Sequence, residues 1–189
     1  MLLRELFKTI KKPLLEGGNL SSHKDDGSPM PGWHVKDAAM STYCQLYSIL
    51  KCNNLKKEYE QQNNMKFDWV IRTRFDFAIN GRIPFNQIDN SKLYIPNCRM
   101  TQARDFGNDQ FAFSSSDNMD KYSETFSYLD KFYDAGTTFM CEDMMSENWK
   151  LHNLVGDNLI YVDVNHPFPP GKYNGTPHSL IREDFHKWL

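Results

Sequence analysis

The 189-residue chain lacks several features that would assign it to a familiar class. It has no apolar run near the roughly 20 residues that a transmembrane helix needs. Its net charge of −2 excludes the basic footprint expected of a nucleic-acid-binding domain. Only four cysteines occur and none forms a CxxC pair, so no zinc site is indicated and reduced thiols of a cytoplasmic protein are expected. No internal repeat or glycine-rich phosphate loop is present.

The composition is that of a folded protein. Hydrophobic residues make up 40% of the chain and aromatic residues 14%, which is typical of a globular protein with a substantial core. The length suits one domain, and we expect it to span residues 1–189. Residues 17–35 and 168–180 are rich in Gly, Pro, Ser or Asp and are predicted to be loops.

Helical and strand patterns alternate along the chain. A helix is predicted from an N-cap at Asp37 to about Gln62. A second helix is predicted over 118–134, with Ser116 or Asp117 as its N-cap. A third is predicted from an N-cap at Thr137 or Thr138 through Leu154. The predicted strands cover 68–79, 92–96, 108–116 and 158–167. This alternation predicts an α/β fold with a mainly parallel sheet flanked by helices.

The stretch FDWVIRTRFDFAI, residues 67–79, carries a row of charges on a predicted strand. Side chains alternate between the two faces of a strand. One face is predicted to face the core, and it carries Trp69, Ile71, Thr73, Phe75, Phe77 and Ile79. The opposite face carries Val70, Arg72, Arg74, Asp76 and Ala78. In open α/β sheets, ligands bind at the carboxyl ends of the strands, which is where this polar face lies.

The charged row suits two roles, and the residues alone leave both open. Arginine presents a planar fork of donors that matches phosphate or carboxylate oxygens. An aspartate such as Asp76 can hold a divalent cation on a bound diphosphate. Alternatively, the row forms internal ion pairs, between Arg74 and Asp76 or across strands, and binds no ligand.

Three segments together resemble a known family: KFDWVIRTRFDFAI, LYIP and GNDQFAFSSSDNMDKYSETF. They are similar to small GT-A-type glycosyltransferases of large DNA viruses and bacterial glycan clusters, over about residues 36–165. The resemblance implies a GT-A-like, Rossmann-like fold and a hexosyltransferase. The implied donor is a UDP-sugar carrying glucose or a deoxyhexose such as rhamnose, the acceptor is a glycan, and Mn²⁺ or Mg²⁺ binds the diphosphate.

The resemblance also implies roles for the strand residues. Asp76 would bind the metal ion, and Arg72 and Arg74 would orient the sugar diphosphate. The sequence departs from the usual Asp-x-Asp motif, because Ala78 stands where the second carboxylate is expected. A single carboxylate with phosphate oxygens and waters can still hold Mg²⁺ or Mn²⁺.

Three further carboxylates are candidate catalytic residues. Asp109 lies in a segment that faces a bound sugar in the resembling enzymes, although it could instead cap the strand entry as an Asx turn. Glu142 and Asp143 are predicted at a helix N-terminus, where the dipole alone favours carboxylates. In the resembling enzymes a carboxylate at a similar place acts near the anomeric carbon, as a base in inverting enzymes.

Two later residues are weaker candidates. His166 follows the last predicted strand, and some GT-A enzymes use a late histidine as a metal ligand; a solvent-facing loop position is the alternative. Lys172 lies between Gly171 and the NG pair of the loop 168–180 and could contact phosphate, although an ordinary surface loop is the simpler explanation.

Other function classes remain open at this point. The missing second aspartate, and the absence of a strand and glycine turn before residue 36, favour a non-catalytic carbohydrate- or nucleotide-binding module as the alternative. A nucleotidyltransferase would share the metal-on-phosphate chemistry but would be expected to carry a glycine-rich loop. No transmembrane segment is predicted, and the expected location is the cytoplasm, or the host cytoplasm if the protein is viral.

Overall fold

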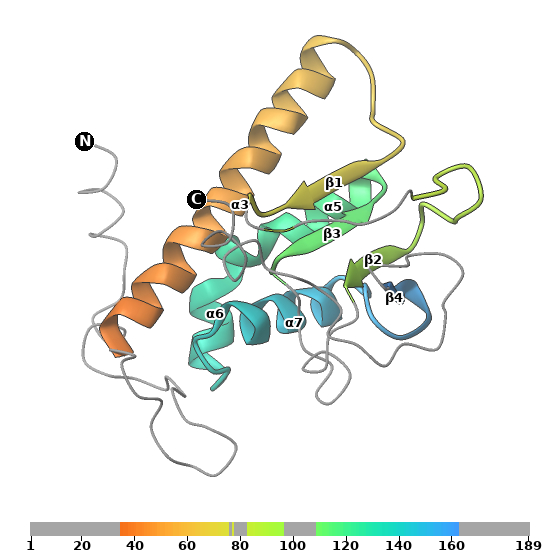
Figure 1. Ribbon diagram of the computed structural model, residues 1–189. Coiled ribbons are helices and arrows are strands. Elements are labelled where there is room, and N and C mark those ends of the chain that lie inside the picture. The colour runs from red at the N-terminus through yellow and green to blue at the C-terminus, as the bar shows by residue number, and fades with distance from the viewer. Residues whose placement is uncertain (1–34, 76, 78–82, 97–108, 163–189) are drawn as a thin grey trace, which may run out of the picture.

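The fold is a mixed α/β arrangement, seen in a computed structural model that describes residues 35–75, 77, 83–96 and 109–162 (Figure 1). In chain order the elements are α3 (Val35–Gln62), β1 (Val70–Thr73), β2 (Leu93–Pro96), β3 (Phe111–Ser114), α5 (Ser116–Ser123), the 3₁₀ helix η1 (Glu124–Tyr128), α6 (Leu129–Asp134), α7 (Cys141–Leu151), the 3₁₀ helix η2 (Gly156–Asn158) and β4 (Leu159–Val162).

The described strands form one sheet in the order β1-β3-β2-β4. β3 is antiparallel to both β1 and β2, and only β2 and β4 are parallel. The prediction of a mixed helix and strand fold is confirmed, whereas the prediction of a mainly parallel sheet is wrong. Parallel neighbours need a long crossover. Among the described residues, helices separate β4 from the earlier strands, but none separates β1, β2 and β3 from one another.

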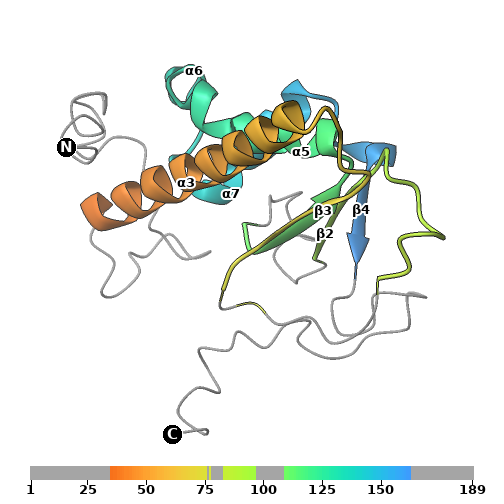
Figure 2. The same ribbon diagram turned by 90° about the horizontal axis from the view of Figure 1, so that it is seen from above.

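The helices lie together on one face of the sheet (Figure 2). Leu93, Ile95 and Ala112 point from the sheet into this helical layer, where they join Leu46 of α3 and Trp149 of α7 in the larger core. The other face carries a smaller, mostly aromatic cluster. Its buried members are Phe77, Tyr94, Phe111, Phe113 and Val162, with Trp69, Ile83, Phe85 and Ile88 packed against them.

The prediction that one face of residues 69–79 packs in the core is wrong for the residues in the middle of that face. Ile71 is 47% exposed and Phe75 is fully exposed, while Trp69 and Phe77 do pack in the aromatic cluster. This face points away from the helical layer, and β1 is at the edge of the sheet that the described strands form, so the cluster on β2 and β3 reaches only part of it. The face with Arg72 is the one turned toward the helices, because its cross-strand partner Ala112 lies in the larger core.

The long helix α3 buries one face, and of the apolar positions Met40, Tyr43, Tyr47 and Leu50 that predict this helix, only Tyr43 is among the buried residues. Buried positions recur three, four or seven residues apart, which places them on one face: Thr42, Leu46, Ile49, Asn53 and Glu60. The helix begins at Val35, so Asp37 is its third residue rather than its N-cap; acidic residues are favourable throughout the first turn, so residue type alone does not fix the position.

The paired asparagines end α3 as predicted. Asn64 has a positive φ of 48°. The Met65 N–H donates to the Glu60 carbonyl at 3.0 Å, which completes a Schellman-type C-cap. Over the part of the chain that the structure describes, no helix is long and apolar enough to cross a membrane.

The predicted helix 118–134 is interrupted. The N-cap is Ser115, whose side chain accepts from the Asn118 N–H. The helix therefore starts at Ser116, which is earlier than a cap at Ser116 or Asp117 would place it. It then breaks into α5, η1 and α6. Thr125 donates its hydroxyl to the Tyr122 carbonyl, a side-chain bond that competes with regular helical pairing. The predicted core stripe is confirmed, with Met119, Tyr122 and Leu129 buried and Phe126 and Tyr133 packed against them.

The next helix, α7, also starts elsewhere than predicted. Its N-cap is Met140, which makes no side-chain cap bond, so Thr137 and Thr138 do not cap it. It ends at Leu151, three residues before the predicted end, and Asn153 follows with a φ of 56°. The last predicted strand is present as β4 up to Val162, and its remaining residues lie outside the described ranges.

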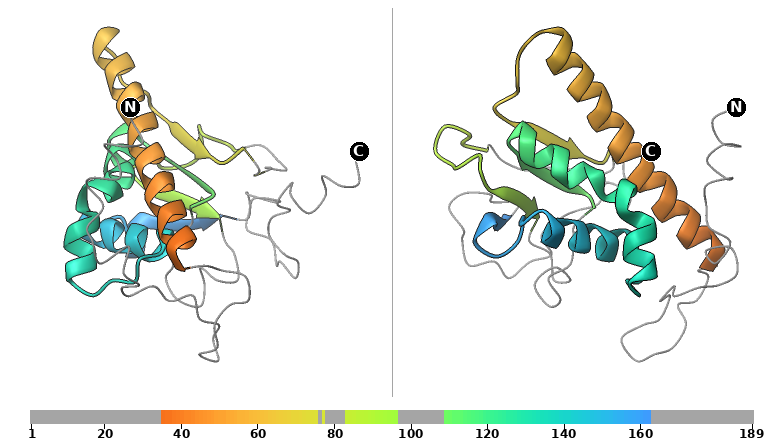
Figure 3. Two further views of the ribbon diagram at one scale, coloured as in Figure 1. Left: turned by 90° about the vertical axis from the view of Figure 1, so that its left-hand side faces the viewer. Right: turned by 180° about the vertical axis from the view of Figure 1, so that it is seen from behind.

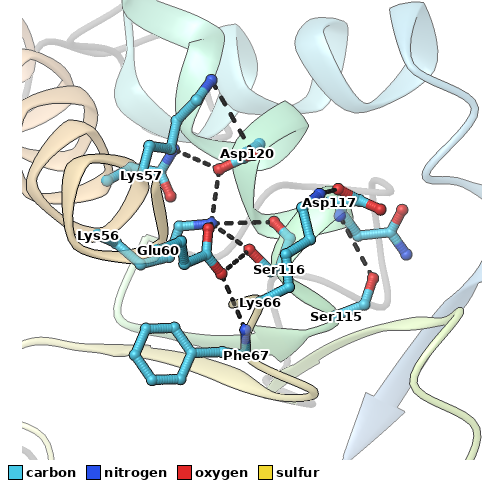
Figure 4. A network of polar contacts seen from close by, with 11 residues as sticks. Lys56, Lys57, Glu60, Lys66, Phe67, Ser115, Ser116, Asp117 and Asp120 are labelled. Atoms are coloured by element: carbon cyan, nitrogen blue, oxygen red, sulfur yellow. Dashed lines mark hydrogen bonds and ion pairs between the residues drawn. The ribbon is translucent and has the colours of Figure 1, made fainter. Parts of the chain in front are cut away.

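A buried polar network joins α3 to α5, two helices that lie side by side in the views of Figure 3. Lys56 Nζ lies 3.2 Å from Glu60 Oε2 and 2.8 Å from Asp120 Oδ1 (Figure 4). Ser116 donates to Glu60 at 2.6 Å, and the Phe67 N–H donates to the same carboxylate oxygen at 2.9 Å. Burial alone would raise the pKa of Glu60, but these hydrogen bonds and the Lys56 charge lower it overall. The network therefore holds α3 alongside α5.

Candidate functional site

Several of the predicted site residues come together where β1 ends. The Arg74 N–H donates to the Gln110 carbonyl at 2.9 Å, which extends the β1–β3 ladder by one step and brings Asp109 beside Arg74. The first turn of α7 lies nearby. Burial raises the pKa of the Cys141 thiol, the charges of Asp109 and Glu142 raise it further, and those of Arg72 and Arg74 oppose them. All four predicted residues are thus close enough to influence one buried thiol.

Asp109 is the most constrained carboxylate of this group. Its side chain is buried, with the residue only 7% exposed. Arg74 Nη1 lies 3.2 Å from Asp109 Oδ2, and Gln45 of α3 donates its amide N–H to the same oxygen. No described donor contacts the other oxygen, Oδ1. The cross-strand ion pair that the sequence left open is therefore formed, between Arg74 and Asp109.

Arg72 lies under the helical layer on the same face of β1 as Arg74. Its Nη1 atom is buried and has no hydrogen-bond partner among the described residues. Burial raises the pKa of the Tyr122 phenol, and the Arg72 charge partly opposes that rise. A buried guanidinium nitrogen without an acceptor is costly, and an anionic ligand group would satisfy it.

The Glu142 carboxyl has a raised pKa. It lies in the first turn of α7, where the helix dipole alone would favour the charged form. Burial instead raises its pKa to about 7, assisted by the negative charges of Asp109 and Asp143, while Arg74 acts in the opposite direction. Such a carboxyl exchanges its proton near neutral pH, which is the property of a general acid or base.

The structure therefore groups five of the eight predicted site residues. Arg72, Arg74, Asp109 and Glu142 all influence the Cys141 thiol electrostatically, and Asp143 follows Glu142 in the first turn of α7. Asp76, His166 and Lys172 lie outside the described residues. Their assigned roles in binding metal or phosphate stay predictions.

The described residues do not supply a metal site on their own. Within residues 35–75, 77, 83–96 and 109–162, no three His, Cys, Asp or Glu side chains could hold an ion together. Asp109 is bonded to two donors on one oxygen, and Glu142 is partly protonated near neutral pH, so neither resembles a ready metal ligand.

Sequence reasoning missed Gln45. The feature that could have indicated Gln45 is its position on the buried side of an amphipathic helix, three residues after Thr42 and four before Ile49. A polar residue at such a position needs a partner, and here the partner is Asp109, 64 residues later in the chain. The length of that separation hides the pair from any local pattern.

Comparison with known proteins places a family model on most of the chain. A family model described as "Domain of unknown function (DUF7796)" matches residues 38–169, which include all five grouped residues as well as Gln45, Asp76 and His166. No curated protein and no solved structure matches the chain.

Proposed function

The chain belongs to this DUF7796 family, and we propose that it is a glycosyltransferase. It moves a hexose, glucose or a deoxyhexose such as rhamnose, from a UDP-sugar to a glycan acceptor. The observation that carries the proposal is the grouping at the end of β1: Arg74 paired with the buried Asp109, Arg72 with a buried nitrogen that has no partner among the described residues, and Glu142, whose pKa is raised to about 7. Phosphate-binding donors and a proton acceptor are the two functions that sugar transfer from a nucleotide needs.

Glu142 is the proposed base. When the acceptor hydroxyl attacks the anomeric carbon in an inverting transfer, the hydroxyl proton passes to the Glu142 carboxylate and UDP leaves with the bonding electrons. A pKa of about 7 suits this role, because a substantial fraction of Glu142 is deprotonated at neutral pH while its basicity is greater than that of an ordinary carboxylate.

Arg72 and Arg74 are the proposed diphosphate-binding residues. Arg72 has a buried nitrogen with no partner among the described residues, so it is the better placed of the two to receive a phosphate oxygen. Arg74 is partly neutralised by Asp109. We expect Arg72 to contribute more of the UDP affinity and Arg74 to act chiefly by holding Asp109.

Mn²⁺ or Mg²⁺ remains part of the proposal. Asp76, two residues after Arg74, would hold the ion, with His166 as a second ligand and Lys172 as a further phosphate contact. When bound, a divalent ion neutralises the charge that develops on the leaving diphosphate. The three free cysteines of the described part support a reducing, cytoplasmic setting for the enzyme.

A non-catalytic nucleotide- or carbohydrate-binding module is the second candidate. The Arg74–Asp109 ion pair favours it, because an arginine paired internally is less available to a substrate. Under this alternative, UDP or sugar binds but no UDP is ever released from a UDP-sugar.

Calorimetric titration of UDP tests the donor site directly. We expect binding to depend on Mn²⁺, Asp76→Ala to abolish that dependence, and Arg72→Met to weaken UDP binding about tenfold or more, as expected for a charge-assisted bond to phosphate. Ser48→Ala is the matched control, because Ser48 is exposed on α3 and bonds only the Cys44 carbonyl. Equal UDP binding by wild type and Arg72→Met would contradict the assignment.

A further inference from the structure

We infer that Gln45 is a positioning residue, which together with Arg74 locks the Asp109 carboxylate so that Oδ1 is left to accept a hydroxyl of the bound sugar. The inference rests on the proposed function for the ligand, and on the structure for the contacts. Gln45 and Arg74 both donate to Oδ2, and they come from two different elements, α3 and the end of β1.

The division between the two carboxylate oxygens is the central observation. A carboxylate accepts on both oxygens, with about four lone-pair sites in total. Here the described donors converge on Oδ2 alone. Asp109 is only 7% exposed as a residue, but Oδ1 is not among the buried side-chain atoms that lack a partner in the described part of the chain. An Oδ1 that keeps some surface exposure can accept from a ligand hydroxyl, and hydroxyls are the groups that a sugar offers in greatest number.

A glutamine is chemically suited to this task. Its amide donates without adding charge, so Asp109 keeps its negative charge and its electrostatic effect on Glu142. Its helix is also well fixed, because the neighbouring Leu46 and Ile49 are buried in the larger core. Side chains on packed helices hold a functional group more accurately than side chains on loops.

The competing explanation is that Gln45 merely ties α3 to the sheet. In that case its loss would destabilise the fold and lower activity to the same extent whatever residue occupied position 109. A positioning role predicts a different result, because replacing Gln45 should then lower activity only when the Asp109 carboxylate is present. A double-mutant cycle separates the two explanations.

The first measurement is steady-state UDP release from the UDP-sugar by the full chain. Gln45→Met keeps the side-chain length but removes the donor. We expect it to lower kcat about tenfold or more while the KM for the UDP-sugar changes less than about twofold, as for an interaction that aligns reacting groups. In the Asp109→Ala background, adding Gln45→Met should cause no further loss. Ser48→Ala, on the same helix, should leave kcat unchanged.

The second measurement is urea unfolding of wild type, the two single variants and the double variant, which needs no activity. We expect Gln45→Met to raise the unfolding equilibrium constant about fivefold more in the wild-type background than in the Asp109→Ala background, where the carboxylate is absent. Equal effects in the two backgrounds would show that Gln45 does not hold Asp109 and would overturn the inference.

The two measurements also separate this inference from the proposed function. If wild type releases no UDP from any UDP-sugar, the proposed function is contradicted, while the urea cycle still decides whether Gln45 holds Asp109. If wild type is active and the kcat losses of Gln45→Met and Asp109→Ala multiply in the double variant, the function stands and the positioning role is wrong.

Discussion

Arg74 Nη1 and Asp109 Oδ2 lie 3.2 Å apart and join the end of β1 to the segment before β3. The pair links residues 35 positions apart in the chain, and its carboxylate also influences Glu142 in the first turn of α7. A change at one member of this group should therefore alter the protonation of another.

Removing the Asp109 charge should lower the pKa of Glu142. A nearby negative charge disfavours a second carboxylate, so Asp109→Asn relieves that repulsion and favours the charged form of Glu142. We expect the pKa to fall from about 7 toward the ordinary value of 4.5 without reaching it, because burial remains the larger cause. Titration of the Glu142 side-chain carboxyl by ¹³C NMR measures the shift.

Asp117→Asn is the control for that titration. Asp117 is exposed and pairs with Lys66 away from the site, so its removal should leave the Glu142 titration unchanged. An unchanged Glu142 pKa in Asp109→Asn would show that the two carboxyls do not interact.

Glu142 should make the protein less stable as pH rises. Its pKa is about 7 in the folded chain and near 4.5 when unfolded, so the folded state binds more protons between these values. The corresponding stability is fully present below about pH 4.5 and is lost as pH rises through about 7, on the order of 1–3 kcal/mol.

Urea unfolding from about pH 5 to about pH 8 tests this dependence, since the loss falls within that window. Glu142→Gln should flatten the profile, because the amide does not titrate. Glu147→Gln, on an exposed side of the same helix, should keep the wild-type slope. A Glu142→Gln profile as steep as that of wild type would assign the loss to other groups.

The Lys56 network should matter more to stability than an exposed ion pair. Lys56→Met leaves the buried Glu60 carboxylate and the partly buried Asp120 carboxylate without their shared cation, and we expect a loss of about 2–4 kcal/mol in the free energy of unfolding. Lys66→Met removes one partner of the exposed pair with Asp117 and should cost less than about 1 kcal/mol. Similar losses for both variants in chemical denaturation would mean that the network is not a buried unit.

Two phenylalanines of the FDWVIRTRFDFAI stretch should respond differently to the same substitution. Phe77 is 7% exposed and stacks on Phe111 with ring centroids 5.4 Å apart, so Phe77→Ser should cost about 3–5 kcal/mol. Phe75 is fully exposed, and Phe75→Ser should change the free energy of unfolding by less than about 0.5 kcal/mol. Thermal unfolding of both variants checks the pair, and a large loss in Phe75→Ser would restore the sequence-based core face.

Local patterns were sufficient for much of this fold. The spacing of Met40, Tyr43, Tyr47 and Leu50 predicted α3, and Asn63–Asn64 predicted its end, because helix periodicity and the left-handed C-cap depend on neighbouring residues only. The core role of Met119 and Tyr122 followed from the same spacing. Helix starts were less accurate, since several residue types near Ser115 can cap equally well.

Long-range geometry was beyond those patterns. Strand direction depends on which strands become neighbours, and β1, β2 and β3 pair without a helical crossover among the described residues. Alternation split the strand at Arg72 into two faces correctly, but it could not say which face the helices cover. Asp109 and Glu142 were singled out by motif and resemblance, whereas Gln45, the hydrogen-bond partner of Asp109, belongs to no motif.

The most direct test of the proposed glycosyltransferase is UDP release from UDP-glucose and UDP-rhamnose, with Mn²⁺ and a glycan acceptor, by wild type and Glu142→Gln. We expect wild-type kcat/KM to rise with pH through about 7 as Glu142 deprotonates, and Glu142→Gln to be about 100-fold slower or more. No UDP release by wild type, or equal rates for the two proteins, would contradict the assignment of Glu142 as the base of a sugar transfer.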